Sequence, residues 1–131
     1  MLGPASSPFS GRNYINLESY KKDGSPKRTP VQSLGDAGLV YFRTGPDTWK
    51  IKRIRRNPHV RIVVSDRRGN PTGTWFDGDA QILEGDESDQ AAKLFRKEYG
   101  AVGTSLVNLV GRMRGEQLTM YVSIKLRPRP T

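Results

Sequence analysis

The sequence predicts a mainly β fold, in which six antiparallel strands form a barrel-like sheet with short helices inserted between them. Apolar and polar residues alternate over several short segments, most clearly from Gln117 to Leu126, and such alternation is typical of half-buried strands. Turn signals such as Asp23-Gly24 separate these segments. The chain has 131 residues, enough for one domain with a modest core, and it contains no repeat or low-complexity block.

Six segments carry the strand pattern. They are expected at residues 14–20, 27–34, 39–42, 60–65, 72–83 and 117–126. Asp77-Gly78 is expected to interrupt the fifth of these strands. Pro30 has no backbone N–H to donate to a neighbouring strand. The second segment is therefore expected at a sheet edge, at a bulge or at the start of a strand, where its backbone can face a ligand.

Helices are expected after the third and fifth strands. The first should span Trp49 to Arg56, with Asp47 or Thr48 as its N-cap. The second should span Asp86 to Tyr99, because its acidic start and basic end suit the helix dipole. Residues 106–113 carry apolar side chains at helical spacing and are expected to form another amphipathic helix.

The two ends of the chain are expected to lie outside the barrel domain. Residues 1–12 contain little that could pack and are predicted to form a flexible arm, residues 13–127 the barrel, and residues 128–131 a tail. The hydrophobic content of 34% and the mean hydropathy of −0.65 are low for a compact monomer. We therefore expect a second subunit to complete part of the core.

The composition excludes several classes of function. The chain has no cysteine and a single histidine, His59, so it has no thiolate chemistry and is poorly supplied with metal ligands. It carries neither a signal-peptide pattern nor an apolar run of about 18 residues, and a cytoplasmic protein without a membrane segment is expected. The net charge of +9 should attract a phosphate-bearing partner, either nucleic acid or a phosphorylated cofactor.

The junction between the third strand and the first helix is the segment most suited to bind an anion. Backbone N–H groups in the first turn of a helix are unpaired and partly positive. Four side chains can add donors around them: Arg43, Thr44, Thr48 and Lys50. The alternative interpretation makes Arg43 and Lys50 solvated surface charges and Thr48 a simple N-cap. In that interpretation the basic residues between positions 50 and 56 lie on the solvent-exposed face of the helix and bind no ligand.

Four segments carry a resemblance to a known family. They are KDGSPKRTPV (residues 22–31), LVYFRTGPDTWKIKRIRRNPHVRI (39–62), RGNPTGTWFDGDAQIL (68–83) and FRKEYG (95–100). In this order they resemble the F420-dependent class of the pyridoxamine 5'-phosphate oxidase-like proteins, over roughly residues 14–126. The resemblance implies a split β-barrel homodimer. Its cofactor would lie in a groove at the subunit interface, with the phosphate held by the third strand and the helix after it.

The resemblance also implies which residues bind the cofactor. Arg28, Thr29, Pro30 and Val31 would line the isoalloxazine or deazaflavin edge, and Arg43, Thr44, Thr48, Trp49 and Lys50 would surround the phosphate. Trp75 is a further candidate that would stack on a ring or cap the partner's groove, although a Trp on a strand more commonly packs in a core or an interface. The sequence departs from the family at Gln32-Ser33-Leu34, where an aromatic pair is common, and at Trp75-Phe76, which replace smaller or acidic residues.

The leading functional hypothesis is an oxidoreductase whose cofactor transfers a hydride to or from a small organic substrate, while the protein orients the cofactor and anchors its phosphate. The resemblance implies coenzyme F420 as the cofactor, with FMN or FAD as alternatives. A non-catalytic cofactor carrier and a basic nucleic-acid-binding barrel are the competing hypotheses. No catalytic residue is identifiable, and Tyr20, Tyr41 and Tyr99 are interpreted as structural.

Overall fold

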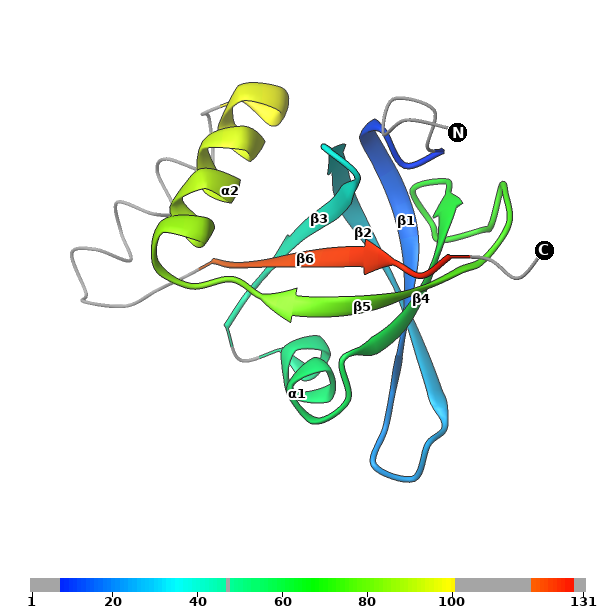
Figure 1. The fold of residues 1–131 in the computed structure, drawn as a ribbon. Coiled ribbons are helices and arrows are strands. Elements are labelled where there is room, and N and C mark those ends of the chain that lie inside the picture. Colours follow the sequence, from blue (N-terminus) through cyan, green and yellow to red (C-terminus); the bar gives the residue numbers. More distant parts are fainter. Residues whose placement is uncertain (1–7, 47, 101–118, 129–131) are drawn as a thin grey trace.

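The computed structural model describes residues 8–46, 48–100 and 119–128, and these form a closed antiparallel barrel of six strands (Figure 1). The strands are hydrogen-bonded in the order β1-β2-β3-β6-β5-β4. The elements are β1 (Gly11–Tyr20), β2 (Pro26–Asp36), β3 (Leu39–Thr44), α1 (Trp49–Arg56), β4 (His59–Ser65), β5 (Phe76–Ile82), α2 (Gly85–Tyr99) and β6 (Met120–Leu126). The predicted six-stranded antiparallel barrel with short helices is therefore confirmed.

The interior of the barrel is filled by one residue in two along each strand. On β1, for example, Ile15 and Leu17 are fully buried. The short helix α1 lies at the lower end of the barrel in Figure 1 and contributes Ile51 and Ile54 to the same hydrophobic cluster. Because α1 connects β3 to β4, this burial holds the helix against the end of the barrel.

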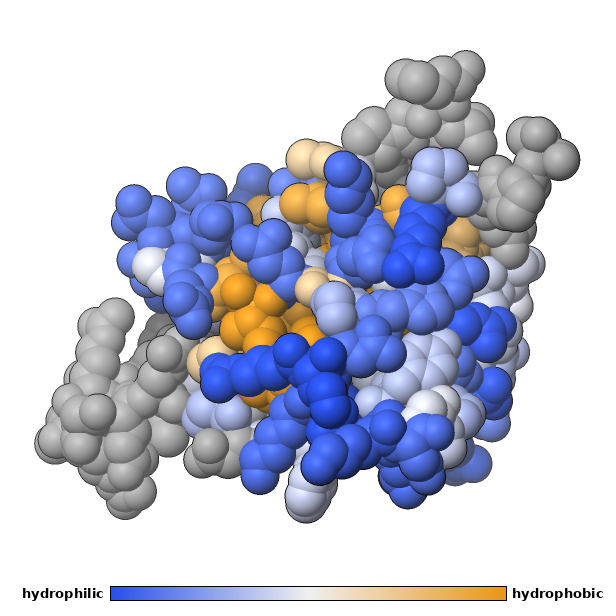
Figure 2. Space-filling view, turned by 60° about the horizontal axis from the view of Figure 1, so that its bottom comes forward, coloured by the Kyte–Doolittle hydropathy of each residue, from blue (hydrophilic) through white to orange (hydrophobic). Residues whose placement is uncertain are grey.

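The longer helix α2 covers part of the outside of the barrel. Its Ala91 and Phe95 are buried in a second cluster that includes Leu34 of β2 and Tyr121 of β6. Elsewhere the surface is largely polar. Figure 2 shows hydrophilic residues over most of one face, with a smaller hydrophobic area between them.

The barrel is split between β2 and β3. β2 pairs with β1 from Pro26 to Gly35, whereas it pairs with β3 only from Ser33 to Asp36. β3 continues to Thr44 along β6 after β2 has left it. Residues 26–32 therefore have a strand partner on one side only, which confirms the sheet edge predicted from Pro30.

The structure corrects the expected arm at residues 1–12. Phe9 is 1% exposed and packs edge-on against the ring of Phe76, and β1 begins at Gly11. Burial of this aromatic side chain offsets part of the entropy lost when these residues are ordered, and backbone pairing of Ser10 and Gly11 with Gly35 adds to it. Residues 8–12 thus belong to the barrel.

The fifth strand differs from the predicted strand at residues 72–83 in its continuity and in its length. Asp77-Gly78 does not interrupt β5, because Gly78 pairs with both neighbouring strands. A Cβ on Gly78 would lie 2.7 Å from Cγ2 of Ile124, so the glycine serves a close approach inside the sheet rather than a turn. Residues 72–75 lie outside the strand.

The predicted helix at 106–113 lies outside the described residues. No helix in the described part of the chain is long and apolar enough to cross a membrane.

The contact between Phe9 and β2 provides a test of the packed N-terminal segment. A Cβ on Gly35 would overlap the backbone carbonyl of Phe9, so Gly35→Ala should lower the free energy of unfolding by about 1–3 kcal/mol. Gly73→Ala is the matched control, because nothing lies within 4 Å of its added methyl group. Urea unfolding measures both variants. Equal stability of the two would contradict the packing of Phe9 against β2.

Candidate functional site

The first turn of α1 is not capped by a side chain. Thr48 is the N-cap residue, but its side chain makes no hydrogen bond to the helix, and no acidic residue lies in the first turn. The Thr48 hydroxyl instead donates to the carbonyl of Gly45 at 3.3 Å and lies 3.3 Å from the hydroxyl of Thr44. Two hydroxyl groups therefore lie together beside helical N–H groups that carry a partial positive charge.

Lys50 adds a half-buried cation to this turn. Its ammonium forms no hydrogen bond or ion pair with any residue that the structure describes. Burial, and after it the charge of Arg53, lowers the pKa of Lys50 below its ordinary value. Each effect makes the charged form of the lysine less favourable, and the opposite charge of a bound anion would offset them. Lys50 is therefore not a fully solvated surface charge, and its contact with a phosphate stays a prediction.

The basic residues of α1 do not all lie on its exposed face. Lys52, Arg55 and Arg56 are exposed, but Arg53 is only 7% exposed and its Nε donates to the hydroxyl of Ser19 at 2.7 Å. Arg53 thus ties α1 to β1. The alternative interpretation of residues 50–56 as a solvated face is wrong at this position.

Arg43 and Trp49 have surroundings of their own. The guanidinium of Arg43 lies 5.0 Å from the ring centre of Phe95, so it packs beneath α2. Trp49 is 71% exposed, with the ammonium of Lys52 4.6 Å from its ring centre. The structure thus brings Thr44 and Thr48 together, and it directs Arg43 toward α2. Contacts of Arg43 and Trp49 with a phosphate stay a prediction.

The β2 segment from Arg28 to Val31 runs along the open edge of the barrel with its side chains on alternating faces. Arg28 and Pro30 are exposed, whereas Val31 packs against the core of the barrel. The four side chains therefore do not all face one ligand. Only the backbone edge is shared by the whole segment, and its contact with a ring stays a prediction.

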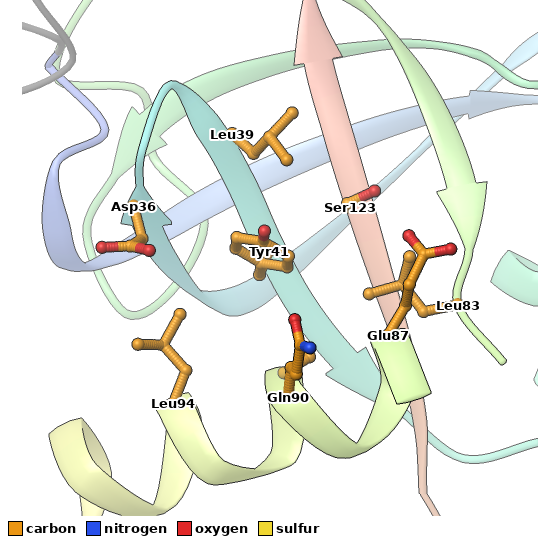
Figure 3. Close-up of a pocket in the computed structure, with 9 residues that line it drawn as sticks. Asp36, Leu39, Tyr41, Leu83, Glu87, Gln90, Leu94 and Ser123 are labelled. Atoms are coloured by element: carbon orange, nitrogen blue, oxygen red, sulfur yellow. The ribbon is translucent and has the colours of Figure 1, made fainter. Parts of the chain in front are cut away.

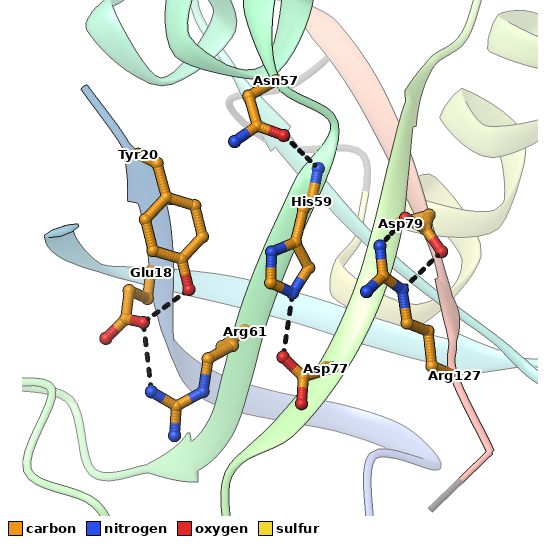
Figure 4. Close-up of polar contacts among 8 residues, drawn as sticks. All are labelled: Glu18, Tyr20, Asn57, His59, Arg61, Asp77, Asp79 and Arg127. Carbon is orange, nitrogen blue, oxygen red and sulfur yellow. Dashed lines mark hydrogen bonds and ion pairs between the residues drawn. The ribbon is translucent and has the colours of Figure 1, made fainter. Parts of the chain in front are cut away.

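Glu18 is a buried carboxylate that sequence reasoning missed. It is 2% exposed and accepts a hydrogen bond from Arg28 Nε at 2.8 Å. A second comes from Arg61 Nη1 at 3.2 Å (Figure 4). The hydroxyl of Tyr20 donates a third at 2.8 Å. Burial by itself raises the pKa of Glu18, but these hydrogen bonds and the two guanidinium charges outweigh it, and the pKa is lowered.

The two arginines held by Glu18 also face Trp75. Their guanidinium carbons lie 4.7 Å (Arg28) and 5.1 Å (Arg61) from the ring centre of the indole. Such distances allow cation–π attraction. Trp75 therefore packs against charged side chains of β2 and β4, and its contact with a cofactor ring stays a prediction.

Tyr20 and Tyr99 both donate hydrogen bonds within the described structure, and both have raised pKa values. Burial and the neighbouring Glu18 raise the pKa of Tyr20 to about 12. Burial likewise raises the pKa of Tyr99, whose hydroxyl donates to the carbonyl of Ser33 at 2.6 Å. His59 stacks on Tyr20 and bonds to Asp77 through Nε2 at 2.8 Å. The two tyrosines have structural partners, in agreement with their interpretation from the sequence.

Comparison with known proteins assigns the split barrel to a family. The family model described as Pyridoxamine 5'-phosphate oxidase matches residues 6–129. The chain therefore belongs to the pyridoxamine 5'-phosphate oxidase family. No curated protein matches the chain.

Several solved structures share the fold at low sequence identity. An F420 reductase has a TM-score of 0.57 and 16% identity, with 92% of this chain and 90% of that chain covered. The heme storage protein HutZ of Vibrio cholerae has a TM-score of 0.63 and 15% identity, with 92% and 84% covered. An FAD-binding protein of Mesorhizobium loti has a TM-score of 0.55 and 21% identity, with 88% and 80% covered. At these identities the likeness extends to the fold alone.

The Glu18 cluster predicts a pH-dependent contribution to stability. Because its pKa is lowered in the fold, the carboxylate stabilises the barrel above the unfolded pKa of about 4.3, and this contribution is lost as the pH falls through the folded pKa. Glu18→Gln should lower the free energy of unfolding by about 2 kcal/mol at pH 7. The difference from the unmodified protein should shrink below pH ~4.

Denaturant unfolding at several pH values measures this dependence. Asp89→Asn is the control, because Asp89 is exposed on α2 beyond its first turn and has no ion pair within the described residues. Its effect should stay within about 0.5 kcal/mol at every pH. A loss in Glu18→Gln that does not change with pH would contradict the role assigned to the ionised carboxylate.

Proposed function

We propose that this chain is a cytoplasmic oxidoreductase that binds a deazaflavin or flavin cofactor in a groove between two copies of itself. The observation that carries the proposal is the half-buried Lys50 ammonium, which has no anionic partner in the described structure and lies in an uncapped helical turn. The chain enters this turn from the end of β3, beyond the point where β2 stops pairing with β3. Membership of the pyridoxamine 5'-phosphate oxidase family supports the same kind of cofactor.

Each part of the site has a role in this proposal. Lys50, Thr44 and Thr48 would hold the phosphate, because an ammonium, two hydroxyls and helical N–H groups all donate to an anion. The edge of β2 at residues 28–31 would lie along the ring. A bound reduced cofactor supplies the hydride for an unsaturated or quinone-like substrate, and the chain supplies orientation and a shielded groove.

Coenzyme F420 is the preferred cofactor within this proposal. Its polyglutamate tail adds negative charges that a chain of net charge +9 attracts. One structure of the same fold is an F420 reductase, while another is an FAD-binding protein. FMN and FAD present a similar ring and phosphate, and they remain the alternatives.

A non-catalytic cofactor carrier is the second candidate function. Similarity to a heme storage protein favours it, because it shows that this fold also serves storage. The pKa values of Tyr20 and Tyr99 are moved away from neutrality, so neither supplies a proton readily near pH 7. A carrier would bind the cofactor without oxidising or reducing any substrate.

The proposed site requires a dimer, which the surface favours. The mean hydropathy of −0.65 leaves little apolar material for a core, while Trp49 and the hydrophobic area in Figure 2 are open to solvent. Light scattering coupled to size-exclusion chromatography should give a mass of two chains at micromolar concentration. A mass of one chain, with cofactor bound, would exclude the groove between subunits.

Removal of the Lys50 charge tests the cofactor site. Titration with F420, FMN and FAD, followed by ring fluorescence at low and high salt, should show tightest binding of F420 to the unmodified protein. Lys50→Gln should weaken the binding of that cofactor at least about tenfold, because a charge-assisted contact of about 1.5–3 kcal/mol is lost. Nucleic acid would contact many cations, and single-stranded DNA should lose only a fraction of its affinity.

Lys22→Gln is the matched control for charge. Lys22 is exposed in the turn between β1 and β2, so its replacement should leave cofactor affinity within about twofold. Equal losses in the two variants would indicate attraction by net charge alone. Preference for FMN or FAD would move the assignment to a flavoprotein, and absence of binding by all three cofactors would exclude the proposal.

A further inference from the structure

A cavity of about 200 Å³ lies between α2 and the outer face of the barrel (Figure 3). Its walls come from α2, β3, β6 and the ends of β2 and β5, so it is formed separately from the first turn of α1. The residues that line it are Asp36, Leu39, Tyr41, Leu83, Glu87, Gln90, Ala91, Leu94 and Ser123. None of them is among the residues assigned above to the cofactor.

The cavity combines apolar walls with groups that accept hydrogen bonds. Leu39, Leu83 and Leu94 offer aliphatic side chains from three different elements. Asp36 and Glu87 place carboxylates on either side of the Tyr41 ring (Figure 3). Burial and then these two carboxylates raise the pKa of Tyr41, which indicates that both negative charges act on its hydroxyl. A ligand here would meet an apolar surface and two negative charges.

The polar groups of the cavity are not satisfied by the protein. Asp36 and Glu87 form no ion pair within the described part of the chain. Ser123 is 7% exposed, and its hydroxyl, which lines the cavity, has no hydrogen-bond partner among the described residues. This oxygen is not enclosed by protein atoms and is accessible from the cavity. The lining therefore provides positions for a ligand to donate hydrogen bonds.

The charge of the cavity contrasts with that of the whole chain. The protein carries 22 lysines and arginines against 13 acidic residues. Even so, two carboxylates face this cavity without a paired cation in the described structure. Anions are attracted to the protein as a whole, but Asp36 and Glu87, both exposed at the edge of the cavity, make the local charge negative, which favours a cation.

From these observations we propose that the cavity binds a small organic ammonium compound. The ammonium group would donate to one of the two carboxylates, Asp36 or Glu87, and an apolar body of one ring or a short alkyl chain would lie against the leucines. The volume is below the range of about 300–1,000 Å³ typical of drug-sized ligands, so the ligand must be small. This proposal does not depend on the cofactor, because it uses different residues.

The probe is 2-phenylethylamine, which is an ammonium ion at pH 7, compared with 2-phenylethanol and phenylacetate. The three share one ring and differ in charge. In NMR titrations at low salt, the ammonium should shift the resonances of Leu83, Ala91 and Leu94 with a Kd of the order of 1 mM, as expected for a ligand of this size. The alcohol should bind at least about tenfold more weakly, and the carboxylate should not bind.

The double variant Asp36→Asn, Glu87→Gln tests the two carboxylates. It should weaken the amine at least about tenfold and leave the weak binding of the alcohol unchanged, because only the charges are removed. Asp89→Asn is the matched control, because Asp89 is exposed on α2 and does not line the cavity. Glu87 also lies in the first turn of α2, so unfolding curves are recorded for each variant.

The outcomes decide between the proposal and its alternatives. Equal binding of amine and alcohol, unchanged amine affinity in the double variant, or shifts at Leu83, Ala91 and Leu94 that do not saturate would each overturn it. Cofactor titrations of the double variant should match those of the unmodified protein. Failure of the cofactor proposal would therefore leave the amine-binding result unaffected, and failure of the amine-binding proposal would leave the cofactor result unaffected.

Discussion

The pairing of β1 with β4 closes the barrel, and most of the features described above depend on it. β1 pairs with β2 along its whole length and with β4 from Tyr14 to Glu18. The two strands of the second pair are far apart in the sequence, with 43 positions between Glu18 and Arg61. This pairing gives β1 and β4 a partner on both sides and creates the interior that the apolar side of the strands fills.

β1 also holds together the elements around the proposed cofactor site. Two successive residues of this strand point to opposite faces. Glu18 binds Arg28 and Arg61 on the outside, whereas Ser19 accepts a hydrogen bond from Arg53 of α1. The open edge of β2 and the helix that carries Lys50 are thereby both attached to one strand. Hydrogen bonds to charged groups are stronger than those between neutral groups. The bonds of Glu18 and Ser19 are therefore well suited to fix the positions of the β2 edge and of α1.

The sequence predicted those parts of the structure that are determined locally. Alternation and turn residues located all six strands, and the first helix was placed at the residues of α1, because Ile51 and Ile54 repeat at helical spacing and a proline follows. The edge position of Pro30 was predicted from its missing N–H. The pairing of Glu18 with Arg28 could also have been predicted, because the turn at Asp23-Gly24 sets the register of the two strands that carry them. The burial of Phe9 was missed because short termini usually lack a packing partner.

The features that sequence reasoning could not predict all depend on contacts between distant segments. Arg61 meets Glu18 only through the register of β1 with β4, and Arg43 turns toward α2 because Phe95 and Tyr99 lie over it. The cavity under α2 is formed by three regions of the chain, at residues 36–41, 83–94 and 123. Neither the composition nor the local periodicity of the sequence predicts the angle at which α2 packs on the sheet. The nine residues that line the cavity therefore form no recognisable sequence motif.

The different surroundings of the two tryptophans have an optical consequence. Trp49 is open to water at the start of α1, whereas Trp75 is faced by two guanidinium groups on the outside of the barrel. A solvated indole emits at longer wavelength than a shielded one and is quenched more readily by iodide, and the cations of α1 attract that ion. The emission spectrum of the unlabelled protein thus contains a reporter for α1 and a second, independent one for the charged cluster at Glu18.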